Sequence, residues 1–543
     1  MKQMSIVSLS LICFLLIAPI YLSTNAFFGI SPHIETQISY DEIELPIFNG
    51  TQVEIFNSEQ AFEGLNIFDL TRANRTSLDS VYTESLVITD MDGNLILEGP
   101  NMNYLADFYN ATTVICHDHD RNVTFWNLAT GRVESLDFGS HHDIEFNPAN
   151  QTLFTLERYF LVFKGYPVAY DSTDDYPFAY DSILEYDLDG NLVWQLNTSS
   201  FIGSYLWCPM KDLIGGGVPD ITHTNSMVYD DTEDVLYLNC RNVNTFYKID
   251  HKTGEVIWGL GENGDFKLYD IYGNEKPSLF YHSHALERIG DNRFILFDND
   301  YHNQTNPNNM RSRIVEIEID EDRMIANQTW VWTSPPDYFS SIYGDADRLP
   351  NGNRIGTFGT GWKPNRTMGA TLAEVTSEGE LVWAFKFLNE NTVDYNIYRM
   401  ERFRFNPIVS NLPDIQIQST NDTILTWNAW YDHRNNYEIE GHYEIIVDNS
   451  LISNETLTYA RYWQPTEIQY SLHSLGAGVH NITIVIYDEI GNSDADSVQV
   501  TVHGSIFDAS SILYTTLFLV IGVTGLLIVI TRLRVRYFPS AME

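Results

Sequence analysis

Short runs in which apolar and polar residues alternate recur along most of the chain. In the stretch HTNSMVYDDTEDVLYLNCRNVNTFYKIDHKTGEVIWGLG, residues 223–261, four such runs are separated by turns rich in Asp, Asn, Gly and Thr. A period of two is typical of β-strands with one buried face, and short polar turns between the runs predict hairpins. Four antiparallel strands within about 40 residues form one blade of a β-propeller.

The same unit recurs before and after this stretch. Similar runs begin at His141, His284 and Gly344, and each unit closes on a strand that carries a tryptophan after an acidic turn. These closing tryptophans are Trp194, Trp258, Trp332 and Trp383. A four-stranded repeat predicts propeller blades rather than a helical solenoid. With two earlier units, around ESLVITDMDGNLILEG and LADFYNATTVICHDHDRNVTFWNLATGRVESLDF, the sequence predicts a six-bladed β-propeller, although five or seven blades fit the same pattern.

The pattern changes after Pro407. Residues 408–503 contain shorter alternating runs such as TILTWNAW and GVHNITIVIYDEIGN, the second of which predicts a strand, an Asp-initiated turn and the next strand. About 95 residues of this kind match a small immunoglobulin-like (Ig-like) β-sandwich. The stretch resembles the Ig-like and polycystic-kidney-disease-type modules of microbial surface proteins. Its predicted role is that of a spacer between the propeller and the membrane.

Both ends of the chain are apolar. Residues 5–22 follow Lys2 and precede small residues, which fits either a signal peptide cleaved near Ala26 or a retained N-terminal anchor. Residues 511–531 carry no charge, are long enough to cross a bilayer as a helix, and precede three arginines that mark the cytoplasmic side. The sequence therefore predicts a single-pass cell-membrane protein whose bulk is extracellular and whose short basic C-terminal tail is cytoplasmic.

Twelve Asn-X-Ser/Thr sequons lie in the segment assigned to the outside, and none lies in the two tails, as expected of a glycoprotein. The predicted fold class is all-β with one transmembrane helix. The predicted segments are a signal peptide or N-terminal anchor (1–27), an N-terminal extension or ring-closing segment (28–83), the β-propeller (84–407), the Ig-like β-sandwich (408–503), the transmembrane helix (510–531) and the cytoplasmic tail (532–543).

Composition narrows the function classes. The 543 residues include 73 acidic and 31 basic side chains, a net charge of −42. A nucleic-acid-binding protein needs a basic face, and none appears in this sequence, so nucleic acid is not a predicted partner. The negative net charge also disfavours docking on an anionic membrane surface. Outside the leader there are three cysteines, Cys116, Cys208 and Cys240. An odd number permits at most one disulfide and leaves the pairing open, so propeller packing must hold the fold.

Five polar residues are candidates for a common site because they stand at the starts or ends of strands in successive blades. They are His142, His223, Asn225, Arg241 and His284. Strand starts of successive blades face the central channel of a propeller, so residues far apart in sequence converge there. Imidazoles, an amide and a guanidinium in an otherwise acidic protein form a local anion site. The alternative is that each histidine only makes a structural hydrogen bond at a strand start.

The motifs around these residues resemble the arylsulfate sulfotransferase family. They are His223-Thr-Asn-Ser followed by Arg241 eighteen residues later, and His284 followed by FDN and SRIVE. The LPNGN at residues 349–353 and the repeated G-[EN]-[LV]-[VI]-W closings agree with it. The resemblance covers roughly residues 85–400 and is specific in the middle blades.

The resemblance implies a mechanism and roles. In that family a propeller-channel histidine takes the sulfuryl group from a phenolic sulfate ester and passes it to another phenol, independently of the nucleotide donor PAPS. His284 is similar to that nucleophile, whereas His223, Asn225 and Arg241 match the sulfuryl-binding set and His142 matches a further histidine. The predicted substrates are small aryl sulfates and phenols, no metal or cofactor is required, and the oligomeric state stays open.

The nucleophile has a neighbour of the same type. His282 precedes His284 by two residues and would share its face on a continuous strand, so the role could belong to either residue. His284 is favoured because the residues after it follow the blade register. Neutral imidazole is a good nucleophile near pH 7, and a covalent intermediate divides one difficult transfer into two easier steps.

Other motifs have simpler explanations. Residues 116–120 (CHDHD) contain metal-ligand types but fit a polar strand end, and the DMDGN and DLDGN motifs at 90–94 and 187–191 lack the later ligands of a calcium loop. They predict hairpin turns. Insertions at 160–182 and 301–310 predict polar-aromatic loops that build ligand contacts or only decorate the surface.

Two further functions compete with sulfuryl transfer. The first is a non-catalytic cell-surface propeller that binds glycans or partner proteins through its rim loops. The second is a quinoprotein-like dehydrogenase, which one tryptophan per blade would fit. The sequence lacks the adjacent Cys-Cys pair and the full calcium set that this second function needs.

Overall fold

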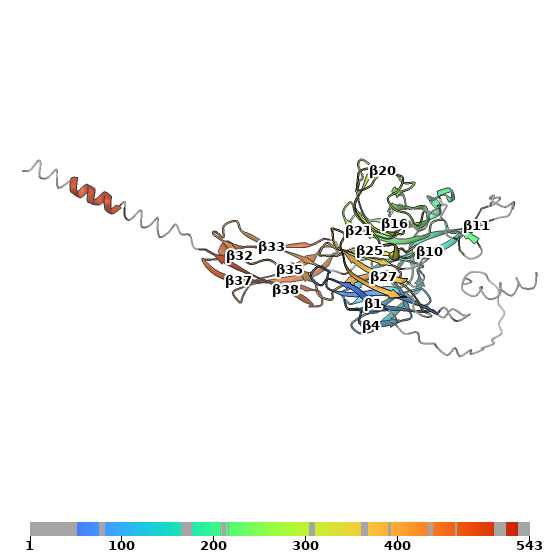
Figure 1. The fold of residues 1–543 in the computed structure, drawn as a ribbon, viewed down its shortest axis with the longest axis horizontal. Coiled ribbons are helices and arrows are strands. Elements are labelled where there is room, and N and C mark those ends of the chain that lie inside the picture. Colours follow the sequence, from blue (N-terminus) through green and yellow to red (C-terminus); the bar gives the residue numbers. More distant parts are fainter. Residues whose placement is uncertain are drawn as a thin grey trace, which may run out of the picture. The chain divides into compact units, whose positions relative to one another are not determined.

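The computed structural model describes residues 51–74, 82–163, 176–206, 208, 213–214, 217–302, 310–359, 368–388, 393–431, 433, 438–461, 464–503, 517 and 519–529. Over these residues the protein is nearly all-β (Figure 1), which confirms the predicted class. The predicted leader, residues 1–27, and the tail, residues 532–543, lie outside this part of the chain.

Six sheets of four or more strands form the larger part of the described chain. The first contains β2 (Leu65–Asn74), β3 (Tyr82–Thr89) and β4 (Leu95–Pro100), with β29 (Val393–Asn396) and β30 (Met400–Phe403). The second contains β5 (Met102–Asn110), β6 (Thr113–Asp118), β7 (Asn122–Asn127) and β8 (Val133–Gly139). The third contains β9 (Ile144–Asn147), β10 (Thr152–Phe163), β11 (Tyr176–Asp187) and β12 (Leu192–Asn197).

The next three sheets continue in chain order. The fourth contains β15 (Thr224–Asp230), β16 (Val235–Cys240), β17 (Thr245–Asp250) and β18 (Val256–Gly261). The fifth contains β21 (His284–Gly290), β22 (Arg293–Asp298), β23 (Arg313–Asp320) and β24 (Ile325–Thr333), extended by β19 (Lys267–Tyr269) and β20 (Glu275–Lys276). The sixth contains β25 (Asp345–Arg348), β26 (Arg354–Phe358), β27 (Met368–Val375) and β28 (Leu381–Leu388), with β1 (Thr51–Phe56) at its edge.

The sheets form a ring. Strands of neighbouring sheets touch in cyclic order: β5 contacts β9, β9 contacts β15, β15 contacts β21, β21 contacts β25, β26 contacts β30, and β2 contacts β5. This order agrees with a β-propeller, and the number of six blades stays a prediction. Strands from the two ends of the region complete two neighbouring sheets, because β1 pairs with β28 and both β29 and β30 pair with β2. These pairings cover sheet edges that would otherwise expose unpaired backbone groups.

Two of the four closing tryptophans join neighbouring sheets. All four lie on the strands β12, β18, β24 and β28, each of which follows an acidic turn. The indole Nε1 of Trp383 donates to the backbone oxygen of Met91 at 2.8 Å, and that of Trp332 donates to the backbone oxygen of Gly379 at 3.2 Å. Each acceptor lies in a turn of the neighbouring sheet, so Trp332 and Trp383 each couple two successive sheets.

Side-chain hydrogen bonds form the turns that the sequence predicted. Asp90 Oδ1 accepts from the backbone nitrogens of Asp92 (3.0 Å) and Asn94 (2.8 Å), and the turn after Asp187 has the same bonds. The calcium-like motifs are therefore hairpin turns. The prediction that residues 160–182 form a loop is partly wrong, because β10 and β11 continue their pairing as far as Phe163 opposite Tyr176. Most of the second insertion, 303–309, lies outside the described residues.

The residues after the ring form two sheets around one core. One sheet contains β31 (Ile408–Val409), β33 (Ile424–Trp430) and β36 (Thr466–Ser471). The other contains β32 (Ile415–Ile417), β34 (Ile439–Val447), β35 (Ser450–Tyr459), β37 (Gly478–Asp488) and β38 (Ser493–Val502). Trp427 is fully buried between them with Ile484 and Val498. The region is a β-sandwich, and its assignment to the Ig-like class stays a prediction.

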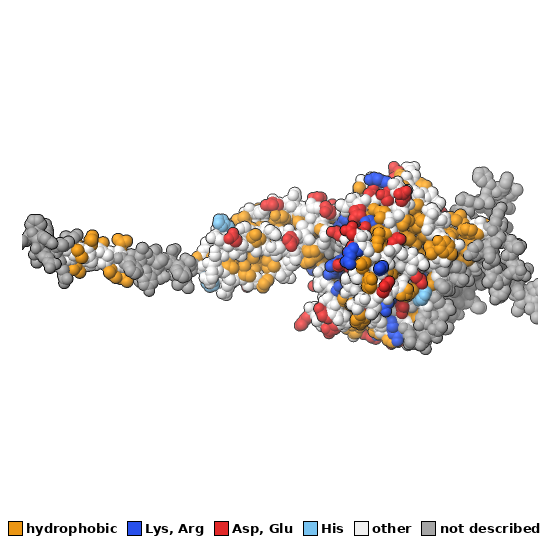
Figure 2. All heavy atoms as spheres, turned by 90° about the horizontal axis from the view of Figure 1, so that it is seen from above, with side chains coloured by type: hydrophobic (Ala, Val, Ile, Leu, Met, Phe, Trp, Pro, Cys, Tyr) orange, Lys and Arg blue, Asp and Glu red, His pale blue; other side chains and the backbone are white. Residues whose placement is uncertain are grey.

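Short elements connect these sheets. They are β13 (Leu213–Ile214), β14 (Val218–Pro219) and the 3₁₀ turns η1 (Thr198–Ser200), η2 (Ser204–Leu206), η4 (Arg241–Val243), η6 (Pro336–Tyr338) and η7 (Leu472–Ser474). Near the C-terminus residues 519–529 are helical. Within the described residues, no helix is both long and apolar enough to cross a membrane. On the face shown in Figure 2, acidic and basic side chains lie intermixed over the ring of sheets.

Candidate active site

The five residues predicted to form the site lie at the inner ends of three consecutive sheets. His142 precedes β9 by two residues, His223 immediately precedes β15, Asn225 lies within β15, Arg241 follows β16, and His284 opens β21. Asn225, Arg241 and His284 are buried, whereas His142 and His223 are partly exposed. The site therefore has a buried set of three side chains and two imidazoles that solvent reaches.

Tyr398, which the sequence analysis did not predict, connects these residues. Its ring stacks with that of His142 (centroids 5.7 Å apart, interplanar angle 17°) and lies edge-on to that of His284 at 5.9 Å. Its hydroxyl donates to the backbone oxygen of Asn225 at 3.1 Å. The rings of His142 and His223 are 5.1 Å apart. The structure thus brings together residues from the first, third, fourth and fifth sheets.

Buried carboxylates hold the inner strands in register around Tyr398. Asp69 Oδ1 accepts from the backbone nitrogens of Tyr398 (3.0 Å) and Arg399 (2.8 Å). Asp143 Oδ1 accepts from Arg399 Nη1 at 2.7 Å, and its Oδ2 accepts from the backbone nitrogen of Met227 at 2.8 Å. Burial raises the pKa of Asp69 to about 7, although its hydrogen bonds oppose that shift.

Asn299 determines which nitrogen of His284 carries the proton. Asn299 Nδ2 donates to the backbone oxygens of Ser340 and Tyr343, each at 2.8 Å. Because carbonyl oxygens only accept, these two bonds fix the orientation of the amide. Asn299 Oδ1 must then accept from His284 Nδ1, 2.7 Å away. Neutral His284 therefore carries its proton on Nδ1, and the lone pair of Nε2 is available to an electrophile.

Electrostatics favour the neutral form of the buried imidazoles. Burial and then the Arg241 guanidinium lower the pKa of His284 well below its ordinary value, against the effect of the Asn299 hydrogen bond. Burial and then His141 lower the pKa of His142 in the same way. At neutral pH both rings are uncharged, so Arg241 supplies the fixed positive charge beside His284.

Arg241 and Asn225 are held by hydrogen bonds to their surroundings. Arg241 Nη1 donates to Asn242 Oδ1 at 2.9 Å, and Nη2 donates to the backbone oxygen of Ser341 at 3.4 Å. Asn225 Nδ2 donates to the backbone oxygen of Ser283 at 2.8 Å, and its Oδ1 accepts from Asn239 Nδ2 at 2.7 Å. One amide hydrogen of Asn225 thus supports the residue before His284, in addition to any contact with substrate.

Asp220 orients His223. Asp220 Oδ2 lies 2.7 Å from His223 Nδ1 and also accepts from Arg158 Nη2 at 3.0 Å. An ionised carboxylate only accepts, so His223 donates from Nδ1, and its Nε2 is left for another partner. Neither Asp220 nor Asn299 was predicted as a site residue. Asn299 is the last residue of the FDN motif, which was the one sequence signal that could have identified it.

The structure separates His282 from His284. The expectation that the two share one strand face is wrong, because β21 begins at His284 and His282 has a left-handed backbone with φ of +56°. His282 Nε2 lies 3.4 Å from Cys208 Sγ, outside the group around Tyr398. Of the two histidines, His284 is the one beside Tyr398.

Several residues at or next to the site have left-handed backbones. Tyr104, His223, His282 and Tyr343 have φ values of +45°, +46°, +56° and +62°. In this region a side chain other than glycine costs about 1–2 kcal/mol. Such strain persists where the surrounding structure imposes it, and it clusters at functional sites.

The other predicted clusters do not form sites. Cys116 and His117 are buried at the end of β6, and Asp118 Oδ1 accepts from the backbone nitrogens of Asp120 and Asn122, each at 2.9 Å. The strand-end interpretation of residues 116–120 therefore agrees with the structure. Within the described residues, Cys116, Cys208 and Cys240 are buried and form no disulfide.

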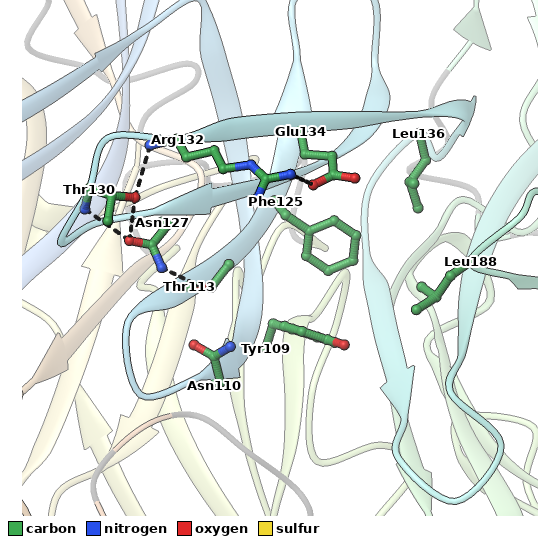
Figure 3. Close-up of a pocket in the computed structure, with 10 residues that line it drawn as sticks. All are labelled: Tyr109, Asn110, Thr113, Phe125, Asn127, Thr130, Arg132, Glu134, Leu136 and Leu188. Carbon is green, nitrogen blue, oxygen red and sulfur yellow. Dashed lines mark hydrogen bonds and ion pairs between the residues drawn. The ribbon is translucent and has the colours of Figure 1, made fainter. Parts of the chain in front are cut away.

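A separate pocket of about 460 Å³ lies on the second sheet (Figure 3). Its lining includes Tyr109, Phe125 and the exposed ion pair between Arg132 and Glu134, whose atoms are 2.9 Å apart. None of the histidines described above lines it. None of the five predicted site residues lines it either, so the pocket is separate from the site around Tyr398.

Comparison with known families agrees with this arrangement. The sequence model of the arylsulfotransferase (ASST) family matches residues 61–399, which is more than half of the chain and includes all five predicted site residues. The chain belongs to the arylsulfotransferase family. At the level of the family this supports sulfuryl transfer as the activity and small aryl molecules as substrates.

Similarities to solved structures are low. The β-propeller domain of Cps50 (Swd1) from Myceliophteria thermophila matches with 11% identity and a TM-score of 0.31. The match covers 64% of this chain and 89% of that domain's chain. The extracellular domain of a hybrid two-component system from B. thetaiotaomicron has 7% identity and a TM-score of 0.29, with coverages of 83% and 58%. The CARDB domain of a Pyrococcus furiosus protein has 8% identity and a TM-score of 0.14, with coverages of 18% and 85%. A comparison with curated proteins gave no significant match.

Proposed function

We propose that the protein is a membrane-tethered, extracytoplasmic sulfotransferase that moves a sulfuryl group from an aryl sulfate ester to a phenol. The intermediate is a sulfohistidine on His284. The observation that carries this proposal is the hydrogen bond from His284 Nδ1 to Asn299 Oδ1, which leaves the lone pair on Nε2. The membrane tether rests on the uncharged segment 511–531 and the arginines that follow it.

The reaction has two balanced steps. In the first, His284 Nε2 attacks the sulfur of the aryl sulfate, the N–S bond forms, and the bond between sulfur and the aryl oxygen breaks. In the second, the oxygen of an acceptor phenol attacks the same sulfur, the N–S bond breaks, and His284 is regenerated. Arg241 and the amide hydrogens around it stabilise the negative charge on the sulfuryl oxygens in both transition states.

A proton moves in the opposite direction to the sulfuryl group. The departing aryl oxide gains a proton, and the acceptor phenol loses one. His223 is suited to carry this proton, because it is partly exposed and Asp220, 2.7 Å from its Nδ1, stabilises the imidazolium that forms when Nε2 takes a proton. Asp220 thereby has a positioning and electrostatic role and does not itself take the proton.

The test is transfer from a chromogenic phenyl sulfate, followed with and without a phenol acceptor. Donor alone should add one sulfuryl mass to the peptide that contains His284, and this group should be released by acid. His284→Asn should abolish labelling and lower turnover by several orders of magnitude, as deletion of a covalent nucleophile does. His119→Asn is the matched control, because His119 is exposed and distant from the site in the chain.

A second variant tests the charge at the site. Arg241→Lys keeps the positive charge but loses the planar guanidinium, so transfer should fall about 10- to 1000-fold. If wild-type protein transfers no sulfuryl group from any phenyl sulfate, or if His284→Asn retains transfer, the enzymatic proposal fails. The non-catalytic binding propeller is then the better explanation.

A separate experiment tests the membrane tether. Protease added to intact cells should degrade the propeller, and full protection would contradict the extracellular location.

A further inference from the structure

We propose that Cys208, His282 and His302 bind a transition-metal ion of the Zn²⁺ class, at a site adjacent to the sulfuryl-transfer residues but separate from them. The three side chains come from distant parts of the chain. Cys208 lies between η2 and β13, His282 precedes β21, and His302 follows β22. No local sequence motif joins them, and the sequence analysis predicted no metal ligands here.

The spacing of the donor atoms is that of a coordination shell. Cys208 Sγ lies 3.4 Å from His282 Nε2 and 3.5 Å from His302 Nδ1. The three donor atoms all lie within 4.8 Å of one another. In a tetrahedral zinc site, with Zn–S of about 2.3 Å and Zn–N of about 2.0–2.1 Å, the distance from sulfur to nitrogen is about 3.5 Å. One ion could therefore reach all three donors.

Each side chain is held in place by its surroundings. Cys208 and His282 are buried, and the backbone nitrogen of His282 donates to Asn244 Oδ1 at 2.9 Å. The ring of His302 stacks on that of Tyr281 with centroids 4.0 Å apart and an interplanar angle of 18°. Ligands fixed by packing lose little conformational entropy when an ion binds. The left-handed backbone of His282 is part of this arrangement, because it directs the ring away from His284.

The ligand types select the ion. One thiolate and two imidazoles suit Zn²⁺ and are poor ligands for Ca²⁺ or Mg²⁺, which prefer oxygen. Cys208 loses its proton when it binds, and a fourth position remains for water. The ion would join the residue two positions before His284 to two other segments. Its role is to fix the start of β21, and no step of sulfuryl transfer passes through it.

The experiment uses the full-length protein in detergent, stripped with a strong chelator and reloaded with Zn²⁺ alone. After removal of free ion, elemental analysis should find about one zinc per chain, and the melting temperature should rise with added Zn²⁺. Co²⁺ in place of Zn²⁺ should give a thiolate-to-metal charge-transfer band. Cys208→Ala and His302→Ala should each weaken zinc binding by more than the 10- to 100-fold that loss of an outer-shell partner costs.

Controls separate metal binding from folding and from catalysis. Cys116→Ala also removes a buried thiol but should retain about one zinc per chain. His302 is partly exposed, so His302→Ala tests the site without emptying a buried position. The proposal would be overturned if the wild type holds no zinc, or if Cys208→Ala and His302→Ala bind zinc as tightly as the wild type. Either result would mean that the Cys208 thiol only makes hydrogen bonds. Binding of copper but not zinc would overturn the choice of ion. None of these measurements depends on sulfuryl transfer.

Discussion

Replacement of Asn299 by leucine removes the hydrogen bonds that orient His284 while keeping a side chain of similar size. Asn299 Oδ1 accepts from His284 Nδ1 at 2.7 Å, and Nδ2 donates to the backbone oxygens of Ser340 and Tyr343. Leucine can make none of these bonds. The imidazole then loses its preference for the Nδ1–H tautomer and its fixed orientation, so Nε2 is no longer reliably unprotonated and directed at the donor.

The expected loss of turnover follows from two contributions. A hydrogen bond between neutral groups contributes about 1–1.5 kcal/mol, and its loss changes the tautomer population about five- to tenfold. A misplacement of about 1 Å of the reacting atom can cost up to about 100-fold. Together they predict that kcat falls about 10- to 1000-fold. The Michaelis constant should change little, because Asn299 lies behind the imidazole and not against the donor.

Steady-state transfer from a chromogenic phenyl sulfate measures both constants. The rate of sulfohistidine formation in the absence of acceptor isolates the first step. Stability needs its own control, because the buried backbone oxygen of Ser340 and the partly buried one of Tyr343 lose a donor, and unfolding should become about 1–3 kcal/mol easier. Asn353→Leu is the matched variant: Asn353 is buried, and its Nδ2 donates to the backbone oxygen of Gln60 at 2.8 Å and to Glu374 Oε1 at 2.6 Å. It should lose comparable stability and keep its kcat.

Two outcomes would refute this reasoning. If Asn299→Leu keeps kcat within about twofold of the wild type, the Asn299 bond does not position the nucleophile. If kcat falls equally in Asn299→Leu and Asn353→Leu, the loss reflects general destabilisation. A rise in the Michaelis constant with unchanged kcat would place Asn299 in donor binding instead.

Two further predictions concern stability. His251 bonds Asp234 (2.7 Å) and Glu185 (2.9 Å); burial lowers the pKa of His251, but these hydrogen bonds outweigh burial and raise it. The stabilisation from these bonds is complete below the ordinary histidine pKa and is lost as the pH rises through the raised pKa. In urea titrations, His251→Gln should therefore cost more unfolding free energy at about pH 6 than at about pH 9. Equal costs at the two pH values would contradict this prediction. Arg402 and Glu374 form a fully buried ion pair between β30 and β27, so Arg402→Met should cost about 3–5 kcal/mol; a loss below about 1 kcal/mol, the value of an exposed pair, would contradict this.

Features that depend on local interactions could be predicted from the sequence. The Asp-initiated turns were visible because Asp187 Oδ1 accepts from backbone nitrogens two and four residues later. The alternating runs identified most blade strands because the strand period reflects one buried face. His223 and Arg241 could be placed together because they stand at adjacent ends of β15 and β16, which form one hairpin. The family motifs lie in these same hairpins.

Contacts between distant segments were decided only by the tertiary structure. The ring closes where β1 pairs with β28, and Tyr398 enters the site from the connection between β29 and β30, two strands that pair with β2. The cluster of Cys208, His282 and His302 is likewise assembled from three separate segments. Residue spacing records which side chains share a strand or a hairpin, but it carries no information on which strands meet across the ring. Those contacts depend on how the twisted sheets pack around one axis. So does the proton position on His284, because the backbone oxygens of Ser340 and Tyr343 fix the orientation of the Asn299 amide.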